Sequence, residues 1–209
     1  MREGLLAAYE DLKNKIDARL AEFKSVDRRD AGRLFEELTF CVLTPQSRAS
    51  SALIAVEELK ATNLLLKGSS RSIAGLLRRT GVRFHNQKAR YVVTNRSLLR
   101  GDPPRIVEVL TLKPTEAREA LVREAWGIGY KEASHFLRNV GVEGLAVLDR
   151  HVIKWMMRVG WLNTMPRSLT KRNYLRIEQK FMEWADYLGI KPEALDLLLW
   201  YLQTGELLK

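Results

Sequence analysis

The chain has 209 residues, enough for one large domain or two small lobes that share a core. Its 35 basic and 25 acidic residues give a net charge of +10, which favours a polyanionic partner such as nucleic acid or a membrane surface. The single cysteine, Cys41, excludes an intramolecular disulfide and a four-cysteine iron–sulfur cluster, and its apolar neighbours predict a buried, inert thiol. The three histidines lack the paired spacing of a zinc site, so we expect no metal.

Apolar residues recur at helical spacing along the chain, and convincing alternation of period two is absent. Prolines and glycines interrupt this pattern. Thr115 is the expected N-cap of the helix at 114–125, and Gly189 and Gly205 are the expected ends of the last two helices. In chain order, the predicted helices cover approximately residues 5–23, 31–43, 47–61, 72–80, 87–99, 114–125, 131–139, 149–159, 170–188 and 192–204. The sequence therefore predicts an all-α fold with short connections. The chain opens without a signal-peptide pattern, and no apolar run reaches the roughly 20 residues that span a bilayer.

The segment Trp126-Gly127-Ile128-Gly129-Tyr130 lies between two predicted helices. Gly127 and Gly129 allow positive φ and a close approach of the backbone to a ligand. The N–H groups that begin the next helix carry the positive end of its dipole, where a phosphate fits. This pattern predicts a helix-hairpin-helix unit that holds a DNA strand without reading its bases. A tight turn between helices explains the segment equally well.

Lys131 stands in the first turn of the following helix, where the dipole disfavours the ammonium form. An uncharged amine can attack a carbonyl-level carbon and form a Schiff base, although Lys131 alone is better explained as a solvated contact to DNA phosphate. Asp149 follows 18 residues later and precedes a helix, so its default interpretation is an N-cap. A capping carboxylate can also assist deprotonation of the amine and stabilise positive charge on a sugar ring.

Together, the runs Gly127-Ile128-Gly129-Tyr130-Lys131-Glu132-Ala133 and Leu148-Asp149-Arg150-His151-Val152 resemble the helix-hairpin-helix DNA glycosylase superfamily, to which endonuclease III belongs. In that superfamily a lysine at the hairpin marks a bifunctional glycosylase/AP lyase. The resemblance implies that Lys131 is the nucleophile and Asp149 the essential carboxylate. Residues 43–47 resemble the superfamily loop whose glutamine, here Gln46, approaches the gap left by a flipped base, and residues 84–89 resemble a helix-start segment.

Within the superfamily, the chain resembles the archaeal-type 8-oxoguanine DNA glycosylases, because it is short, lacks cluster cysteines and ends in Lys209. That family ends in a lysine close to the base pocket. The terminal carboxylate of Lys209 can accept hydrogen bonds from a guanine edge, and Phe84 or Trp200 can stack on an extruded base. Without the resemblance, a frayed tail and ordinary core aromatics explain these residues.

The resemblance implies two helical lobes with DNA bound in the cleft between them. Residues 26–145, with the hairpin at 126–131, are expected to form a helical-barrel lobe, and residues 1–25 plus 146–209 the second. The enzyme is expected to flip 8-oxoguanine out of duplex DNA, excise it through Lys131, and cut the abasic site by β-elimination without a cofactor. We expect a monomer without a membrane partner, located in the cytoplasm and associated with the nucleoid when acting. The alternatives are a glycosylase of the same fold for another damaged base, and a non-catalytic DNA-binding module.

Several further residues have simpler explanations. His135 lies one turn after Lys131, and we interpret it as structural. Five basic residues are candidates for contacts with DNA phosphates, although a solvated helix face explains each of them: Arg48, Lys88, Arg138, Arg150 and Lys154.

Overall fold

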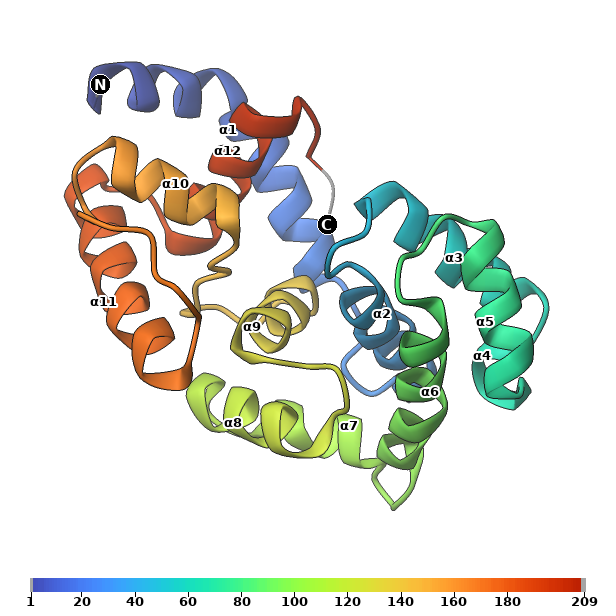
Figure 1. Cartoon of the computed structure of the whole chain (residues 1–209). Helices are drawn as coiled ribbons and strands as arrows, with labels where there is room; N and C mark the ends of the chain where they lie inside the picture. Colours follow the sequence, from blue (N-terminus) through green and yellow to red (C-terminus); the bar gives the residue numbers. More distant parts are fainter. Residues whose placement is uncertain (1, 208–209) are drawn as a thin grey trace. The chain divides into compact units, whose positions relative to one another are not determined.

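The computed structural model describes residues 2–207, and its secondary structure is helical throughout (Figure 1). Between residues 2 and 207 there is no strand, and the one β-bridge joins Gly101 to Pro104. The predicted all-α fold is confirmed. Within the same range, no helix combines the length and the apolar composition needed to cross a membrane.

The chain divides into two compact units. Unit 2 is Val26–Phe136, and unit 1 combines the segment up to Ser25 with the segment from Leu137 onward. The helices of unit 2 are α2 Ala31–Leu43, α3 Ala49–Ala61, α4 Leu64–Lys67, α5 Ser70–Arg79, α6 His85–Asn95, η1 Arg96–Leu99, α7 Arg105–Glu108, η2 Val109–Thr111 and α8 Pro114–Glu124. Helix α9, Tyr130–Asn139, crosses the division, and unit 1 also holds α1 Arg2–Lys24, α10 Arg150–Arg158, α11 Lys171–Leu188 and α12 Pro192–Thr204.

The division falls inside α9, whereas the sequence placed the lobe boundary after residue 145. The physical reason is that the loop after α9 is hydrogen-bonded to α11 and α12. Gly144 N–H donates to Glu193, and Ala146 N–H donates to Glu178. These bonds attach residues 141–148 to unit 1.

Helix α2 is the central helix of unit 2. Its residues from Leu34 to Leu43 are buried apart from the partly exposed Glu36, and Cys41 is buried as predicted. Helices α3, α6 and α7 pack around it. A helix that is apolar on nearly all sides must be enclosed by other elements, so α2 organises this unit.

Helix α12 has the same role in unit 1. Its residues from Glu193 to Leu199 are buried, and α1, α10 and α11 pack against it. The buried carboxylate of Asp196 accepts a hydrogen bond from the guanidinium of Arg138, which also lies 5.4 Å from the ring of Phe23. Arg138 is therefore a core residue, and its interpretation as a DNA phosphate contact was wrong.

The last two helices end at the predicted glycines, and α11 begins one residue after its predicted start because Thr170 is its N-cap. The side chain of Thr170 accepts from Asn173 N–H, and Gly189 and Gly205 end α11 and α12 with φ of 68° and 76°. The predicted N-cap at Thr115 was wrong, because α8 begins at Pro114 and its N-cap is Lys113. Proline has no N–H to lose in the first helical position, and its fixed φ already suits a helix.

Candidate active site

Helix α6 holds the loop that contains Gln46. The ammonium group of Lys88 is buried and donates hydrogen bonds to the carbonyl oxygens of Leu43 and Pro45, each at 2.7 Å, and to Ser47 Oγ at 3.0 Å. Burial, aided by the charge of Arg83, lowers the pKa of Lys88 to about 8. Lys88 is thus a structural link between two chain segments, and its interpretation as a phosphate contact was wrong.

Gln46 and Phe84 lie on two loops that are tied together by this link. Ser47 Oγ also accepts a hydrogen bond from Arg83 N–H at 3.0 Å. Both Gln46 and Phe84 have a left-handed backbone, with φ of 56° and 57°, and both side chains are exposed, Phe84 by 51%. Non-glycine residues in this conformation are strained by about 1 kcal/mol or more, and such strain persists where surrounding structure enforces it.

The other end of α6 holds the glycine hairpin. The side-chain amide of Asn95 accepts from Trp126 N–H at 2.7 Å and donates to Trp126 O at 3.0 Å. A Cβ added to Gly127 would lie 2.4 Å from Cδ2 of the Tyr91 ring. Asn95 and Tyr91 therefore fix the backbone of the hairpin, and their role was not predicted from the sequence.

The two glycines of the hairpin differ. Gly127 has φ of 77°, so it needs both the conformational freedom of glycine and the absence of a side chain. Gly129 has no positive φ, so the freedom expected for it is not used. Its N–H donates to Glu132 Oε2 at 3.2 Å, and its carbonyl accepts from Ala133 N–H at 2.9 Å, which begins α9.

Lys131 is the second residue of α9 and its side chain is half-buried. It makes no hydrogen bond or ion pair with the residues between 2 and 207. One turn later, His135 is buried and its ring lies 5.7 Å from the ring of Phe40, which supports the structural interpretation of this histidine. The amine of Lys131 is consequently available to a ligand at the first turn of the helix.

Asp149 is positioned by buried polar groups of α11. Tyr174 Oη donates to the carbonyl of Ala146 at 2.6 Å and accepts from Leu148 N–H at 3.4 Å, while Glu178 Oε1 accepts from Ala146 N–H at 3.1 Å. Residues 145–148 are themselves buried. The chain therefore reaches Asp149 on a fixed path.

The carboxylate of Asp149 is the N-cap of α10, as predicted. Its Oδ1 accepts from His151 N–H at 2.7 Å and from Val152 N–H at 2.8 Å. Among residues 2–207 its Oδ2 has no hydrogen-bonding or ionic partner. One oxygen thus orients the side chain, and the second remains available to a ligand.

His151 and Trp200 form a pair that the sequence did not predict. Their rings are 5.5 Å apart and nearly perpendicular, at 85°. His151 Nδ1 and Trp200 Nε1 are both buried without a hydrogen-bond partner in the described part of the chain. Buried polar atoms are almost always paired, so these two nitrogens are exceptions, and His151 lies two residues after Asp149. Lys209, the other predicted pocket residue from this region, lies outside the described residues.

Comparison with known families places these residues in context. Residues 16–190 match the family described as Ogg-HhH, 8-oxoguanine DNA glycosylase. The chain belongs to this family. It is 36% identical over 206 residues to an 8-oxoguanine DNA glycosylase/AP lyase of Fusobacterium nucleatum, with 96% of this chain and 94% of the relative covered.

Solved structures of the same family have the same fold. The 8-oxoguanine DNA glycosylase of Thermotoga maritima superposes with a TM-score of 0.91 at 37% identity, covering 100% of this chain and 98% of that one. The Methanocaldococcus jannaschii 8-oxoguanine glycosylase/lyase, in complex with a 15mer DNA containing 8-oxoguanine, superposes with a TM-score of 0.87 at 34% identity. That match covers 98% of this chain and 99% of that one.

Proposed function

We propose that this chain is a bifunctional DNA glycosylase/AP lyase that excises 8-oxoguanine from duplex DNA during base excision repair. The observation that carries the proposal is the state of its two candidate catalytic groups. Lys131 has no protein partner at the first turn of α9, and Asp149 has one oxygen committed to a cap and one without a partner, among residues 2–207. A lysine that only contacted phosphate would need no such carboxylate.

In the proposed reaction, the neutral amine of Lys131 attacks C1′ of the damaged nucleotide. The N-glycosidic bond breaks, and the base leaves with its bonding electron pair and takes up a proton. Opening of the sugar ring then gives a Schiff base between Nζ and C1′. Loss of a proton from C2′ expels the 3′ phosphate by β-elimination, so the strand is cut 3′ to the lesion.

We assign the carboxylate of Asp149 to the cationic stage of this reaction. Its unpartnered oxygen supplies a fixed negative charge that stabilises positive charge developing on the sugar, and it can accept a proton from the attacking amine. The capping bonds to His151 and Val152 N–H hold that charge in a single orientation without a cost at the moment of reaction.

The remaining candidates are assigned to DNA and to the base. The hairpin at Gly127 and Gly129 is proposed to contact a backbone phosphate through N–H groups. Extrusion of the base costs a few kcal/mol of unstacking, and Gln46 is proposed to fill the space that the base leaves. Phe84 or Trp200 is proposed to stack on the extruded base. Exposure of Phe84 and its strained backbone support its assignment. The terminal carboxylate of Lys209 is proposed to read the guanine edge.

The proposed partner is duplex DNA with a single 8-oxoguanine. We expect the protein to act as a monomer, because one chain supplies every group used above. We also expect it to associate with the nucleoid when it acts, because its proposed substrate is DNA. Light scattering of the free protein and of its complex with one duplex measures the number of chains. A complex that requires two chains contradicts this expectation.

The proposal is tested by trapping the Schiff base with borohydride on duplexes that each carry one different lesion. The wild type should trap 8-oxoguanine DNA, and Lys131→Gln should abolish trapping while duplex binding remains. Lys13→Gln is the matched control, because Lys13 is an exposed lysine on α1. Binding of duplex without trapping contradicts the proposal, trapping that survives Lys131→Gln places the nucleophile elsewhere, and preferential trapping of another lesion favours a different base.

Two substitutions separate the roles of Asp149. Asp149→Asn keeps an oxygen for the cap, since Asn and Asp are comparable N-caps, but it removes the charge. We expect its free energy of unfolding to change by less than about 0.5 kcal/mol, while the single-turnover excision rate falls at least about 100-fold. Asp149→Ala should show the same fall in excision rate. Its free energy of unfolding should also fall by roughly 0.5–2 kcal/mol, the usual value of an N-cap. An Asn variant as active as the wild type contradicts the assigned role.

A further inference from the structure

The net charge of the chain is concentrated in one segment. Residues 59–101 contain 10 lysines and arginines and no aspartate or glutamate, whereas the rest of the chain holds 25 basic and 25 acidic residues. This segment includes α5 and α6, which pack closely against each other in unit 2. Charge of a single sign on two neighbouring helices predicts a surface that attracts anions.

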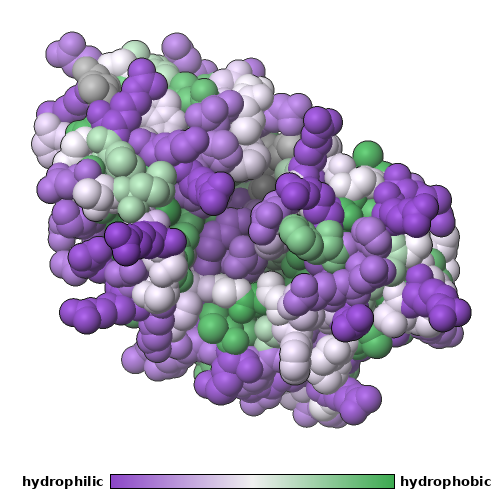
Figure 2. Space-filling view, viewed as in Figure 1, coloured by the Kyte–Doolittle hydropathy of each residue, from purple (hydrophilic) through white to green (hydrophobic). Residues whose placement is uncertain are grey.

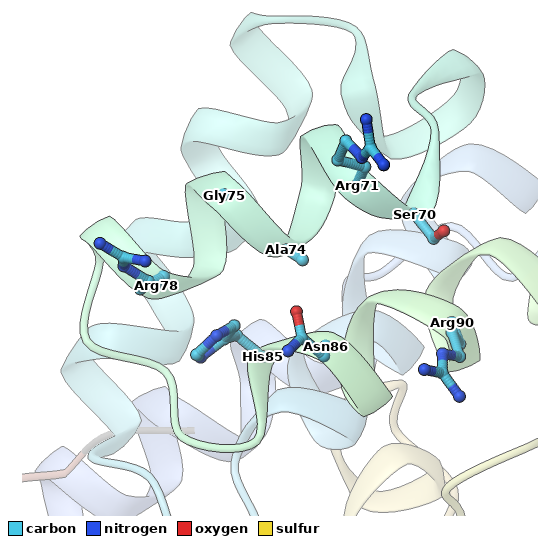
Figure 3. A pocket seen from close by; sticks show the side chains of 8 residues that line it. All are labelled: Ser70, Arg71, Ala74, Gly75, Arg78, His85, Asn86 and Arg90. Carbon is cyan, nitrogen blue, oxygen red and sulfur yellow. The ribbon is translucent and has the colours of Figure 1, made fainter.

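An open groove of about 370 Å³ lies between these two helices (Figure 3). Arg71 and Arg78 line it from α5, and Arg90 lines it from α6. Ala74 and Gly75 lie between the two arginines of α5 and have no long side chain to fill the groove. The remaining lining residues, Ser70, His85 and Asn86, are all polar. We call this site the α5–α6 groove.

The three arginines are exposed and have no protein acceptor. None of them forms an ion pair or side-chain hydrogen bond with any residue of the range 2–207. This differs from Arg105, whose guanidinium binds Glu124 at 2.8 Å and Glu108 at 2.9 Å. Three unpaired guanidiniums without a nearby carboxylate favour binding of an external anion, because guanidinium groups match phosphate oxygens in geometry and charge.

The groove uses a separate face of α6 from the candidate active site. Lys88 on this helix holds the Gln46 loop, while Tyr91 and Asn95 hold the hairpin. Asn86 points toward α5 instead, and His85 and Arg90 also line the groove (Figure 3). Hydrophilic side chains also predominate on the surface of this part of unit 2, with isolated apolar residues between them (Figure 2). An apolar protein segment is therefore a poor match for this surface.

The spread of the charges favours a polymer over a single small anion. Arg71 and Arg78 are seven residues apart on one helix, which is about 10 Å along its axis at roughly 1.5 Å per residue. The guanidinium groups of Arg71, Arg78 and Arg90 also point away from one another (Figure 3). This spread suits a nucleic-acid backbone, which presents charges repeatedly along its length, better than one small anion. We propose that the α5–α6 groove binds backbone phosphates of DNA outside the segment held by the hairpin. The proposal rests on the proposed function in so far as DNA is the substrate.

The test measures binding of an undamaged duplex that extends past the protein on both sides, across a series of salt concentrations. The groove variant carries Arg71→Gln, Arg78→Gln and Arg90→Gln. We expect the slope of log affinity against log salt to become shallower by about 1 for each phosphate that the variant no longer neutralises, and so by up to about 3. Near physiological salt, the affinity should fall by roughly 10- to 100-fold.

The matched control removes three positive charges elsewhere, through Lys13→Gln, Lys15→Gln and Arg172→Gln, at exposed positions of unit 1. Both variants should unfold at the wild-type temperature, since all six side chains are on the surface. A groove variant whose salt slope equals that of the control overturns the proposal. A second outcome also overturns the proposal. If pyrophosphate raises the melting temperature of the wild type but not of the groove variant, while the salt dependence of DNA binding is equal in the groove and control variants, the groove binds a small anion. Undamaged DNA needs no excision, so this result is independent of borohydride trapping.

Discussion

Replacement of Gly127 by alanine tests the geometry of the hairpin most directly. The added Cβ would lie 2.4, 2.9 and 3.1 Å from three carbons of the Tyr91 ring, and the backbone φ is 77°. A non-glycine residue in the left-handed region costs roughly 1–2 kcal/mol, and an overpacked contact of this kind typically costs another 1–3 kcal/mol. Gly127→Ala should therefore lower the free energy of unfolding by about 2–5 kcal/mol and slow Schiff-base trapping, since the hairpin must shift.

Gly160→Ala is the matched control, because Gly160 has φ of 86° and a Cβ there would meet nothing within 4 Å. Both variants have the same kind of backbone strain, and in both the unfolded chain loses the same conformational entropy. The difference between their free energies of unfolding, measured with urea, therefore isolates the overlap with Tyr91, which we expect to cost about 1–3 kcal/mol. In a Tyr91→Ala background, Gly127→Ala should cost no more than Gly160→Ala. If the two glycine variants are equally stable in the presence of Tyr91, the argument from the ring contact fails.

Two further positions predict measurable changes. Burial holds the pKa of Lys88 at about 8, below its ordinary 10.5, so from pH 8 to 10.5 the unfolded chain retains a proton that the folded chain has lost. Wild-type stability should therefore rise with pH in this window by up to about 3 kcal/mol relative to Lys88→Met, and parallel pH profiles of the two proteins would contradict this. Tyr174→Phe leaves the buried carbonyl of Ala146 without its 2.6 Å donor and should cost about 1–3 kcal/mol. It should also reduce the excision rate at saturating enzyme by loosening the path to Asp149, and an unchanged rate would show that Tyr174 is only structural.

Local signals in the sequence predicted much of the fold. Asp149 caps its helix, and Gly189 and Gly205 end theirs, because capping depends on hydrogen bonds within one turn. Two one-turn helices, α4 and α7, were not predicted, since four residues contain too little of a helical period to be recognised. The family was also predictable, because its motifs are contiguous.

The tertiary roles of polar side chains were harder to predict. Lys88 and Arg138 have the composition of surface residues, yet each is buried against acceptors 41 to 58 positions away in the sequence. Asn95 gives no sign in the sequence that it binds the backbone of Trp126, 31 residues later. His151 and Trp200 are also far from each other in the chain, and only the fold reveals their buried nitrogens. Pairing of this kind depends on topology, which periodicity does not encode.

The unequal distribution of charge affects how the protein meets its substrate. Residues 59–101 carry the whole net charge, so a polyanion that comes within about one Debye length, roughly 8 Å at physiological ionic strength, is attracted mainly to this segment of unit 2. Attraction of this kind raises association rates and loses its effect steeply as salt increases. The search for damage should consequently be fast and salt-sensitive, while the chemical step, which we propose takes place at Lys131, should be largely insensitive to salt once the complex has formed.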